Sequence, residues 1–184
     1  LKLGGSLIDT SRELMRALVT LVDEENTCFL VVPGGGPFAD LIREINAEMG
    51  LGDEAAHWMA VLAMEQYAFF LADGSGALLT SEVCLPEKGR VNILLPYRAL
   101  TEEDLCPEHS WDYSSDSIAL LVASRLGLPL IKATDVDGVI IEGEVAEERS
   151  ARLLLGRESC SDQGTIRLLL GDLAGMRGWV TNGS

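Results

Sequence analysis

The chain has 184 residues, of which 47% are hydrophobic and 23% charged, and it carries a formal net charge of −15 at pH 7. This length and apolar content predict a single domain over 1–184, and the acidity argues against a nucleic acid or an anionic membrane as partner. No apolar run reaches the roughly 18 residues of a membrane span and the first residues do not form a signal peptide, so we expect a cytoplasmic protein.

The predicted elements alternate between strands and helices along the chain. We predict strands at 1–3, 28–32, 91–95, 128–133 and 178–181, helices at 11–22, 38–49, 53–72, 115–127 and 162–173, and a hairpin of 138–141 with 145–148. The third helix should be capped by Asp53. The first helix should bury one face, made of Leu14, Ala17, Leu18, Leu21 and Val22.

Uniformly apolar strands that alternate with helices are typical of a mainly parallel sheet covered on both faces. In such folds, ligands bind outside the carboxyl ends of the strands. The chain starts at Leu1 and stops just after a strand-like run, so we expect a few residues to be missing at both ends. The four cysteines stand far apart without a C-x-x-C pair, which disfavours a zinc site, and we expect no metal site made of protein side chains.

Two glycine-rich turns follow predicted strands and precede predicted helices: KLGGS at 2–6 and PGGG at 33–36. Bare backbone N–H groups and the positive end of a helix at such a turn form a site for a phosphate or a carboxylate. Glycine is also the ordinary residue of a tight turn, which leaves a purely structural role open. Lys2 favours the anion site, although neither turn matches the Walker A pattern or the G-x-G-x-x-G fingerprint.

Four motifs occur in an order and spacing typical of the amino acid kinase family: KLGGSLI at 2–8, VVPGGGPFAD at 31–40, SWDYSSDSIAL at 110–120 and IKATDVDGV at 131–139. The chain resembles this family, which includes acetylglutamate, aspartate, uridylate and isopentenyl phosphate kinases, over nearly its whole length. The resemblance implies an α/β fold, a three-layer α/β/α sandwich of the amino acid kinase or carbamate kinase type. It also implies an ATP-dependent kinase that uses Mg²⁺ and forms a homo-oligomer, a dimer or larger.

Within the family, HWMAVLAMEQYA at 57–68 followed by SWDYSSDSIAL is most similar to the kinases of methanofuran biosynthesis. This similarity implies that the acceptor of the γ-phosphoryl group is a small phosphomonoester, an aminomethyl-furanmethyl phosphate. Isopentenyl phosphate, UMP and an amino-acid carboxylate stay open as acceptors. An alternative of another class is a non-catalytic nucleotide-binding sensor module, which is disfavoured because Lys2 and Asp116 are both present.

The resemblance implies a role for each glycine loop. The transferring phosphoryl group would be held by Lys2, Gly4, Gly5 and Ser6, and the acceptor by Gly34, Gly35 and Gly36. Asp116 matches the family aspartate that positions the phosphate-binding lysines. Asp112, four residues earlier, is a candidate substrate contact on the same face, and either aspartate is alternatively a helix cap.

The segment KATDVDG at 132–138 resembles the nucleotide-binding loop of uridylate-kinase-like members. The resemblance implies ATP contacts from Lys132, Thr134, Asp135, Asp137 and Gly138. A strand end with an Asp-Gly turn is the structural alternative. Several family members have another ATP-contacting lysine downstream, whereas no lysine follows Lys132 here, so Arg149, Arg152 or Lys132 itself is the candidate for that role.

His57 lies in the third predicted helix, where it is either a core histidine bonded to a carbonyl or an acceptor-binding residue. A histidine of the corresponding helix touches the acceptor phosphate in the isopentenyl phosphate kinase branch, which favours the second interpretation. A phosphate acceptor already carries an oxyanion nucleophile, so His57 would orient the attack rather than act as a strong base. His109 is expected on the surface.

Overall fold

The computed structural model of the protein describes residues 1–103, 109–141, 144–146, 150–157 and 159–184. Six parallel strands form one sheet in the order β3-β4-β2-β1-β5-β8. Their bounds are β1 Lys2–Leu3, β2 Cys28–Pro33, β3 Leu78–Thr80, β4 Arg90–Leu94, β5 Leu130–Thr134 and β8 Gly178–Asn182. The strands β6 (Val139–Ile141) and β7 (Glu144–Ala146) form a separate antiparallel hairpin.

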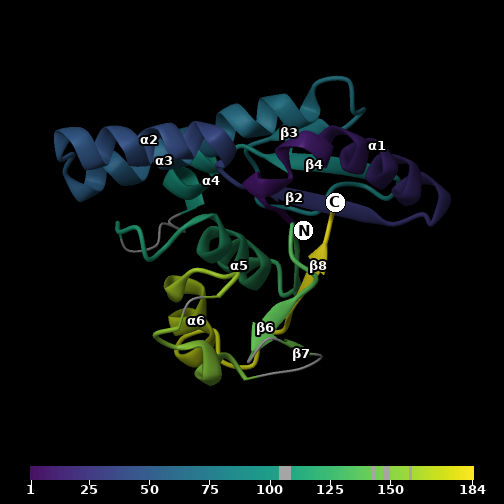
Figure 1. The fold of residues 1–184 in the computed structure, drawn as a ribbon. Helices are drawn as coiled ribbons and strands as arrows, with labels where there is room; N and C mark the ends of the chain where they lie inside the picture. The colour runs from purple at the N-terminus through teal and green to yellow at the C-terminus, as the bar shows by residue number, and fades with distance from the viewer. Residues whose placement is uncertain (104–108, 142–143, 147–149, 158) are drawn as a thin grey trace.

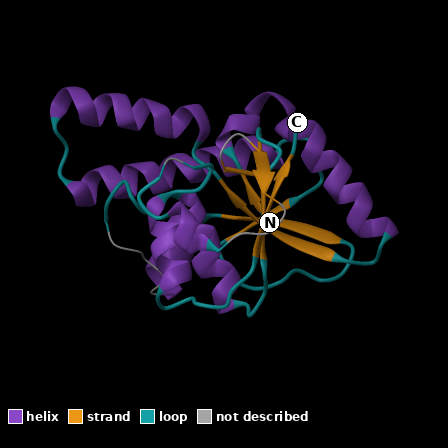
Figure 2. Ribbon diagram, turned by 60° about the horizontal axis from the view of Figure 1, so that its bottom comes forward, coloured by secondary structure: helices purple, strands orange, loops and turns teal. Residues whose placement is uncertain are grey.

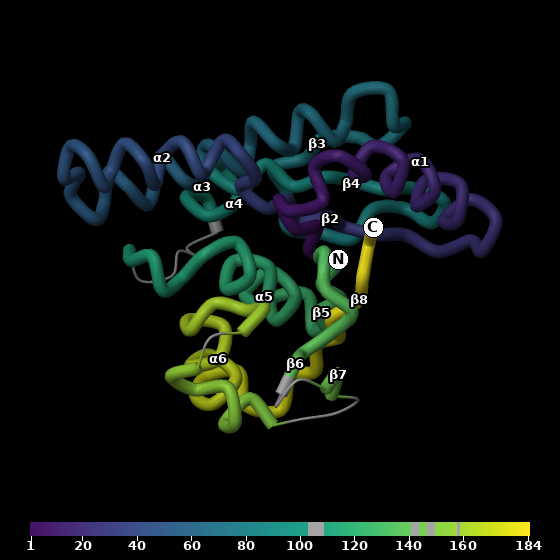
Figure 3. Tube along the Cα trace, in the orientation of Figure 1, coloured from purple at the N-terminus to yellow at the C-terminus, as the bar shows by residue number. Residues whose placement is uncertain are grey.

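Helices cover both faces of this sheet, as Figures 1 and 2 show. The helices α1 and α3 lie on one face and α5 on the other, with α6 beyond α5 (Figure 1). The helices α2 and α3 run side by side and project beyond the sheet (Figure 3). The helices are α1 Ile8–Glu24, α2 Gly36–Met49, α3 Asp53–Ala72, α4 Pro96–Glu103, α5 Ser115–Arg125 and α6 Gln163–Leu170, with short 3₁₀ helices at Gly5–Leu7 and Ala151–Leu154.

The core divides into two clusters because successive side chains of a strand point to opposite faces. Val31 and its neighbour across the sheet, Ile93, pack with α1 and the second half of α3. Leu30 and Val32 face the other way and pack with α5 and the first half of α3. This alternation fixes the register of β2 between the two helical layers.

The predicted three-layer arrangement with a mainly parallel sheet is confirmed. Two predictions about the helices were wrong, the buried face of α1 and the N-cap of α3. The buried face of α1 is Ser11, Met15, Leu18 and Val22, whereas Leu21 is 44% exposed and Ala17 is also exposed. Gly52, not Asp53, occupies the N-cap position of α3. The strand β3 and the helix α4 were not predicted.

The hairpin predicted in the second half of the chain is present as β6 and β7, although positions 147–148 of its second strand lie outside the described residues. In the part of the chain that the structure describes, no helix has the length and apolar character needed to cross a membrane.

Candidate active site at the carboxyl ends of the strands

Two lysines and one aspartate form a buried ionic cluster beside the glycine loops. Lys2 of β1 and Lys132 of β5 are partners in the sheet register, so their side chains leave the sheet on the same face, towards α5. Asp116 stands in the first turn of α5 and lies between them. Its Oδ1 is 2.8 Å from Lys2 Nζ, and its Oδ2 accepts a hydrogen bond from Lys132 Nζ. All three residues are buried.

The electrostatics of this cluster follow from burial and from the shared carboxylate. Burial by itself would raise the pKa of Asp116, but the ammonium groups of Lys2 and Lys132 hold it below its usual value. The pKa of Lys2 is lowered, first by burial and then by the charge of Lys132, while Asp116 opposes the shift. Two ammonium groups therefore contact one carboxylate, which leaves positive charge at this edge of the sheet in a chain whose net charge is −15.

The two glycine loops lie against each other at the same edge. A Cβ atom on Gly5 would lie 2.2 Å from Gly36 N, and one on Gly34 would lie 2.7 Å from Gly5 N, so side chains cannot be accommodated at these positions. Gly4 N donates to Ala133 O and Gly34 N to Leu3 O, at 2.9 and 2.8 Å. These two N–H groups are therefore used within the protein rather than offered to a ligand.

The start of α2 offers N–H groups to a ligand. Gly35 is its N-cap and Gly36 its first residue, and the first N–H groups of a helix have no partner within the helix. Together with the positive end of the helix dipole, they form a favourable position for an anion. The glycines at 34–36 thus serve two purposes, the close contact between loops and the exposure of the α2 N-terminus.

The segment 132–138 is joined to the first glycine loop by side-chain hydrogen bonds. Ser6 Oγ and Thr134 Oγ1 both donate to Asp135 Oδ1, at 2.9 and 3.0 Å, and these bonds lower the pKa of Asp135. Asp137 instead accepts from Asn182 Nδ2 at the end of β8, at 2.8 Å. A Cβ on Gly138 would lie 2.9 Å from Val145 Cγ1, so the glycine lets the β6–β7 hairpin approach. The ATP contacts predicted for the segment 132–138 stay predictions.

A pocket opens between α2, α3 and the segment before α5. Its lining combines apolar, aromatic and polar side chains, including one positive and one negative side chain. Gly35 connects it to the second glycine loop. Its lining residues are Gly35, Ala39, Arg43, Asp53, His57, Ala60, Val61, Met64, Ser110, Trp111, Tyr113, Ser114, Ser115 and Ile118.

His57 lines this pocket and is buried. Burial, and next the charge of His109, lower its pKa to about 4, so the imidazole is neutral at physiological pH. The His109 ring stacks on it, with ring centroids 4.4 Å apart and planes at 17°. His109 is partly exposed and also belongs to this aromatic group beside the pocket.

Asp112 lies apart from the ionic cluster and is not among the residues that line the pocket. Its Oδ2 accepts from Arg167 Nη1 of α6 at 2.7 Å, and both side chains are about half exposed. Neither Asp112 nor Asp116 caps α5, because Ser114 is the N-cap residue. The predicted substrate contact of Asp112 therefore has no support from its surroundings.

Asp162 is the functional candidate that the sequence interpretation missed. It is the N-cap of α6, and its carboxylate also bonds Ser114 and Ser117 at the start of α5. An Asp before the helical run QGTIRLLL is a sequence signal for the first role. The second role joins positions about 45 residues apart and has no local sequence signal.

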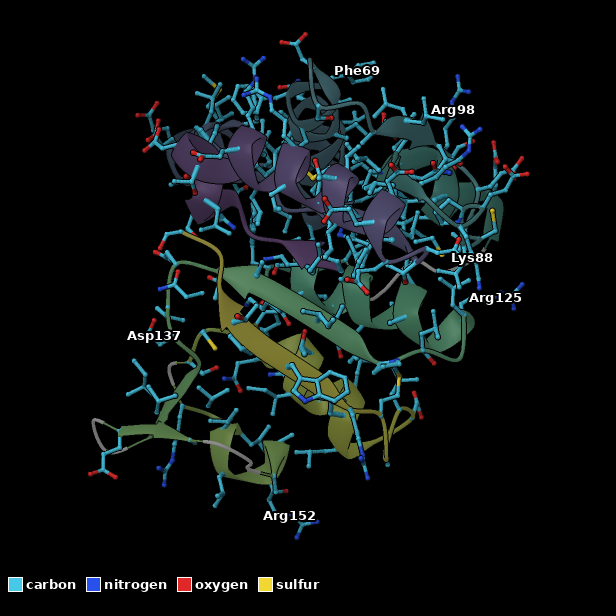
Figure 4. The ribbon with its side chains drawn as sticks, turned by 90° about the vertical axis from the view of Figure 1, so that its right-hand side faces the viewer. Phe69, Lys88, Arg98, Arg125, Asp137 and Arg152 are labelled. Atoms are coloured by element: carbon cyan, nitrogen blue, oxygen red, sulfur yellow. The ribbon has the colours of Figure 1, made fainter. Side chains whose placement is uncertain are left out.

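Two of the three candidates for the role of the downstream lysine lie in the described residues, and of these two Lys132 is in the ionic cluster. The Arg152 side chain points outwards at the far end of the molecule from α1 (Figure 4). Arg149 lies outside the described residues.

In the described ranges, no group of three or more His, Cys, Asp and Glu side chains is arranged to hold a metal ion. Mg²⁺ needs no such group when it enters with a nucleotide, because it keeps several waters and binds phosphates plus one or two carboxylates. The exposed carboxylate of Asp135, beside the first glycine loop, fits that limited role.

Comparisons with known proteins agree with this arrangement. A sequence model of the amino acid kinase family matches residues 1–154. The chain is 35% identical over 146 residues to a (5-(aminomethyl)furan-3-yl)methyl phosphate kinase of Methanocaldococcus jannaschii, which covers 75% of this chain and 66% of that protein, just under two thirds of its length. It is also similar in fold to the crystal structure of a uridylate kinase from Archaeoglobus fulgidus, with a TM-score of 0.65 at 17% identity, covering 100% of this chain and 90% of that one.

Proposed function

Because the chain belongs to the amino acid kinase family, we propose that it transfers the γ-phosphoryl group of Mg·ATP to a small phosphomonoester, most specifically (5-(aminomethyl)furan-3-yl)methyl phosphate. The observation that carries the proposal is the cluster of Lys2, Asp116 and Lys132, in which two buried ammonium groups share one carboxylate beside the start of α2. Phosphoryl transfer requires positive groups fixed around the γ-phosphate, where negative charge spreads over three equatorial oxygens.

In this proposal, an oxygen of the acceptor phosphate attacks the γ-phosphorus, the bond to the bridging oxygen breaks, and ADP leaves. Lys2 holds the transferring group, and Lys132, kept in place by Asp116, supplies the second positive charge. Gly35 and Gly36 at the start of α2 orient the acceptor phosphate through their N–H groups. The nucleotide would lie along 132–138, on the side of the first glycine loop where Ser6 bonds Asp135.

The pocket supports an acceptor with a flat ring. Trp111 and Tyr113 provide aromatic surface, and the apolar residues of the lining suit a furan better than a long polar chain. The neutral His57 can donate or accept one hydrogen bond without adding a charge. The acceptor already carries an ionised oxygen, so no strong general base is required.

The test is ADP release with Mg·ATP and a panel of acceptors: the furan phosphate, isopentenyl phosphate, UMP, glutamate and acetylglutamate. We expect turnover with the furan phosphate, and its loss in Lys2→Met, which controls for a contaminating kinase. Turnover with another acceptor alone would contradict the proposed substrate and keep the kinase. ATP binding without turnover on any acceptor would favour a sensor module.

A further inference from the structure

Among the residues that the structure describes, Asp162 has the most heavily hydrogen-bonded side chain near the ionic cluster. Its Oδ2 accepts from Ser114 N at 2.9 Å, Ser114 Oγ at 2.6 Å and Ser117 N at 3.2 Å. Its Oδ1 accepts from Ser117 Oγ at 2.7 Å and Thr165 N at 2.6 Å. Five donors converge on one carboxylate, which is more than capping a single helix requires.

These donors belong to the first turns of two different helices. Thr165 N is in α6, where Asp162 is the N-cap, and the other four groups surround the start of α5. Asp116 lies between Ser114 and Ser117 in that same turn. The backbone that carries Asp116 is therefore hydrogen-bonded to Asp162 on both sides.

The same short segment also contacts the second partner of Asp116. Cys160 O, two residues before Asp162, accepts a hydrogen bond from Lys132 Nζ. The segment 160–162 thus bonds both Lys132 and the turn that presents Asp116. Ser114, which Asp162 bonds twice, also lines the pocket, so one segment joins the ionic cluster to the acceptor side.

We propose that Asp162 is a positioning residue for phosphoryl transfer. It holds the first turn of α5 so that Asp116 bridges Lys2 and Lys132, and it acts through these residues without touching either substrate. This inference rests on the proposed kinase function for its kinetic consequence, but its geometric claim is independent of the acceptor.

The kinetic test compares Asp162→Asn with Arg167→Gln in the full chain. Asparagine is as good an N-cap as aspartate, so α6 keeps its start, but the amide nitrogen cannot accept the bonds of one carboxylate oxygen. Arg167→Gln is the matched control, because it removes an exposed side-chain link between α6 and the 112–117 turn, the pair with Asp112, and leaves the contact between Thr165 and Ser117 in place. We expect kcat to fall by about 10²-fold in Asp162→Asn, as a displacement of about 1 Å produces, with little change in KM for ATP. Arg167→Gln should keep the wild-type kcat.

Equal kcat values in the two variants would overturn the inference, as would a loss in Asp162→Asn that only follows its unfolded fraction in thermal melts. A second measurement needs no turnover. The chain has three lysines, of which Lys88 is exposed (Figure 4) and lies just before the amino end of β4, away from the carboxyl ends where the glycine loops lie. Labelled lysine (¹³Cε) therefore gives a simple spectrum with an internal reference.

In Asp162→Asn we expect the signals of Lys2 and Lys132 to move and that of Lys88 to stay, with none moving in Arg167→Gln. Unmoved signals would refute the positioning claim even if the variant were inactive. If the wild type turned over no acceptor, the proposed function would fail, and the lysine signals alone would decide whether Asp162 holds the cluster.

Discussion

Asp112 and Asp116 stand four residues apart at the start of α5, and each forms an ion pair, but the surroundings of the two pairs differ. Asp116 contacts Lys2 and Lys132 with side chains only 6–7% exposed. Asp112 contacts Arg167 with side chains 48–50% exposed. Two aspartates only four residues apart therefore differ in their surroundings: Asp116 is buried between two positive charges, whereas Asp112 is half exposed to solvent.

The comparison indicates which ion pair contributes to the stability of this protein and to its action on a ligand. Solvent screens an exposed pair and leaves it with little net contribution to stability. A buried pair has lost its solvation, so removing one partner leaves an uncompensated charge in a poorly solvated place. Such a buried charge is also able to act strongly on a ligand, because little water weakens its field.

Asp116→Asn should have the largest effect. It leaves Lys2 and Lys132 as neighbouring buried ammonium groups without a counter-charge, and we expect the free energy of unfolding to fall by about 3–5 kcal/mol. The kcat should fall by about 10²–10³-fold, the usual cost of losing one preorganised electrostatic group. Urea unfolding and single-turnover kinetics measure the two effects separately. A variant with wild-type kcat and lowered stability would make the cluster a structural feature only.

His57 extends the comparison to a group that is buried and uncharged. Its pKa of about 4 in the folded protein is below the ordinary 6.5, because burial disfavours the imidazolium. The unfolded chain therefore binds more protons between these two values, and the stability contributed by neutral His57 is lost as pH falls from 6.5 towards 4.

We expect His57→Asn to flatten the pH dependence of the urea midpoint in that window and to leave the slope above pH 7 unchanged. The change should be smaller than that in Asp116→Asn, because no charge is left unpaired at neutral pH. A variant that loses stability on acidification as steeply as the wild type would show that other groups control this limb.

Much of the fold could be predicted because its signals are local. Apolar runs and helical periodicity located most strands and helices, and glycine after a strand indicated the edge where the loops meet. The buried face of α1 was harder to predict. Its sequence allows two overlapping apolar faces, and contact with the sheet selects the face with Met15 rather than the one with Leu21.

The candidate site likewise contains residues that the sequence identifies and contacts that it does not. Lys2 and Asp116 were identified from motifs, and the structure brings them together. No sequence pattern indicates that Asp162 bonds the start of α5, since this depends on how α6 packs against α5. Nor does sequence reveal that Gly34 N bonds Leu3 O, because glycine in a ligand loop and glycine in a close backbone contact look alike before the chain is folded.

Arg167→Gln should have the smallest effect and sharpens the comparison from its exposed side. Arg167 pairs with Asp112 at 2.7 Å, a distance as short as that between Lys2 and Asp116, so distance alone would rank the two pairs equally. Solvent exposure predicts that the Asp112 pair contributes less than the Asp116 pair, because water and salt replace the lost partner of Asp112. We expect no measurable change in the thermal midpoint at about 0.15 M salt, and kcat within about twofold of the wild type, as for surface substitutions away from a site. Repeating the melts at low salt should reveal a small destabilisation, since screening is then weaker. A fall in stability as large as that of Asp116→Asn would contradict this expectation. It would mean that the Asp112 pair holds α6 against α5 and contributes to stability in spite of its solvent exposure.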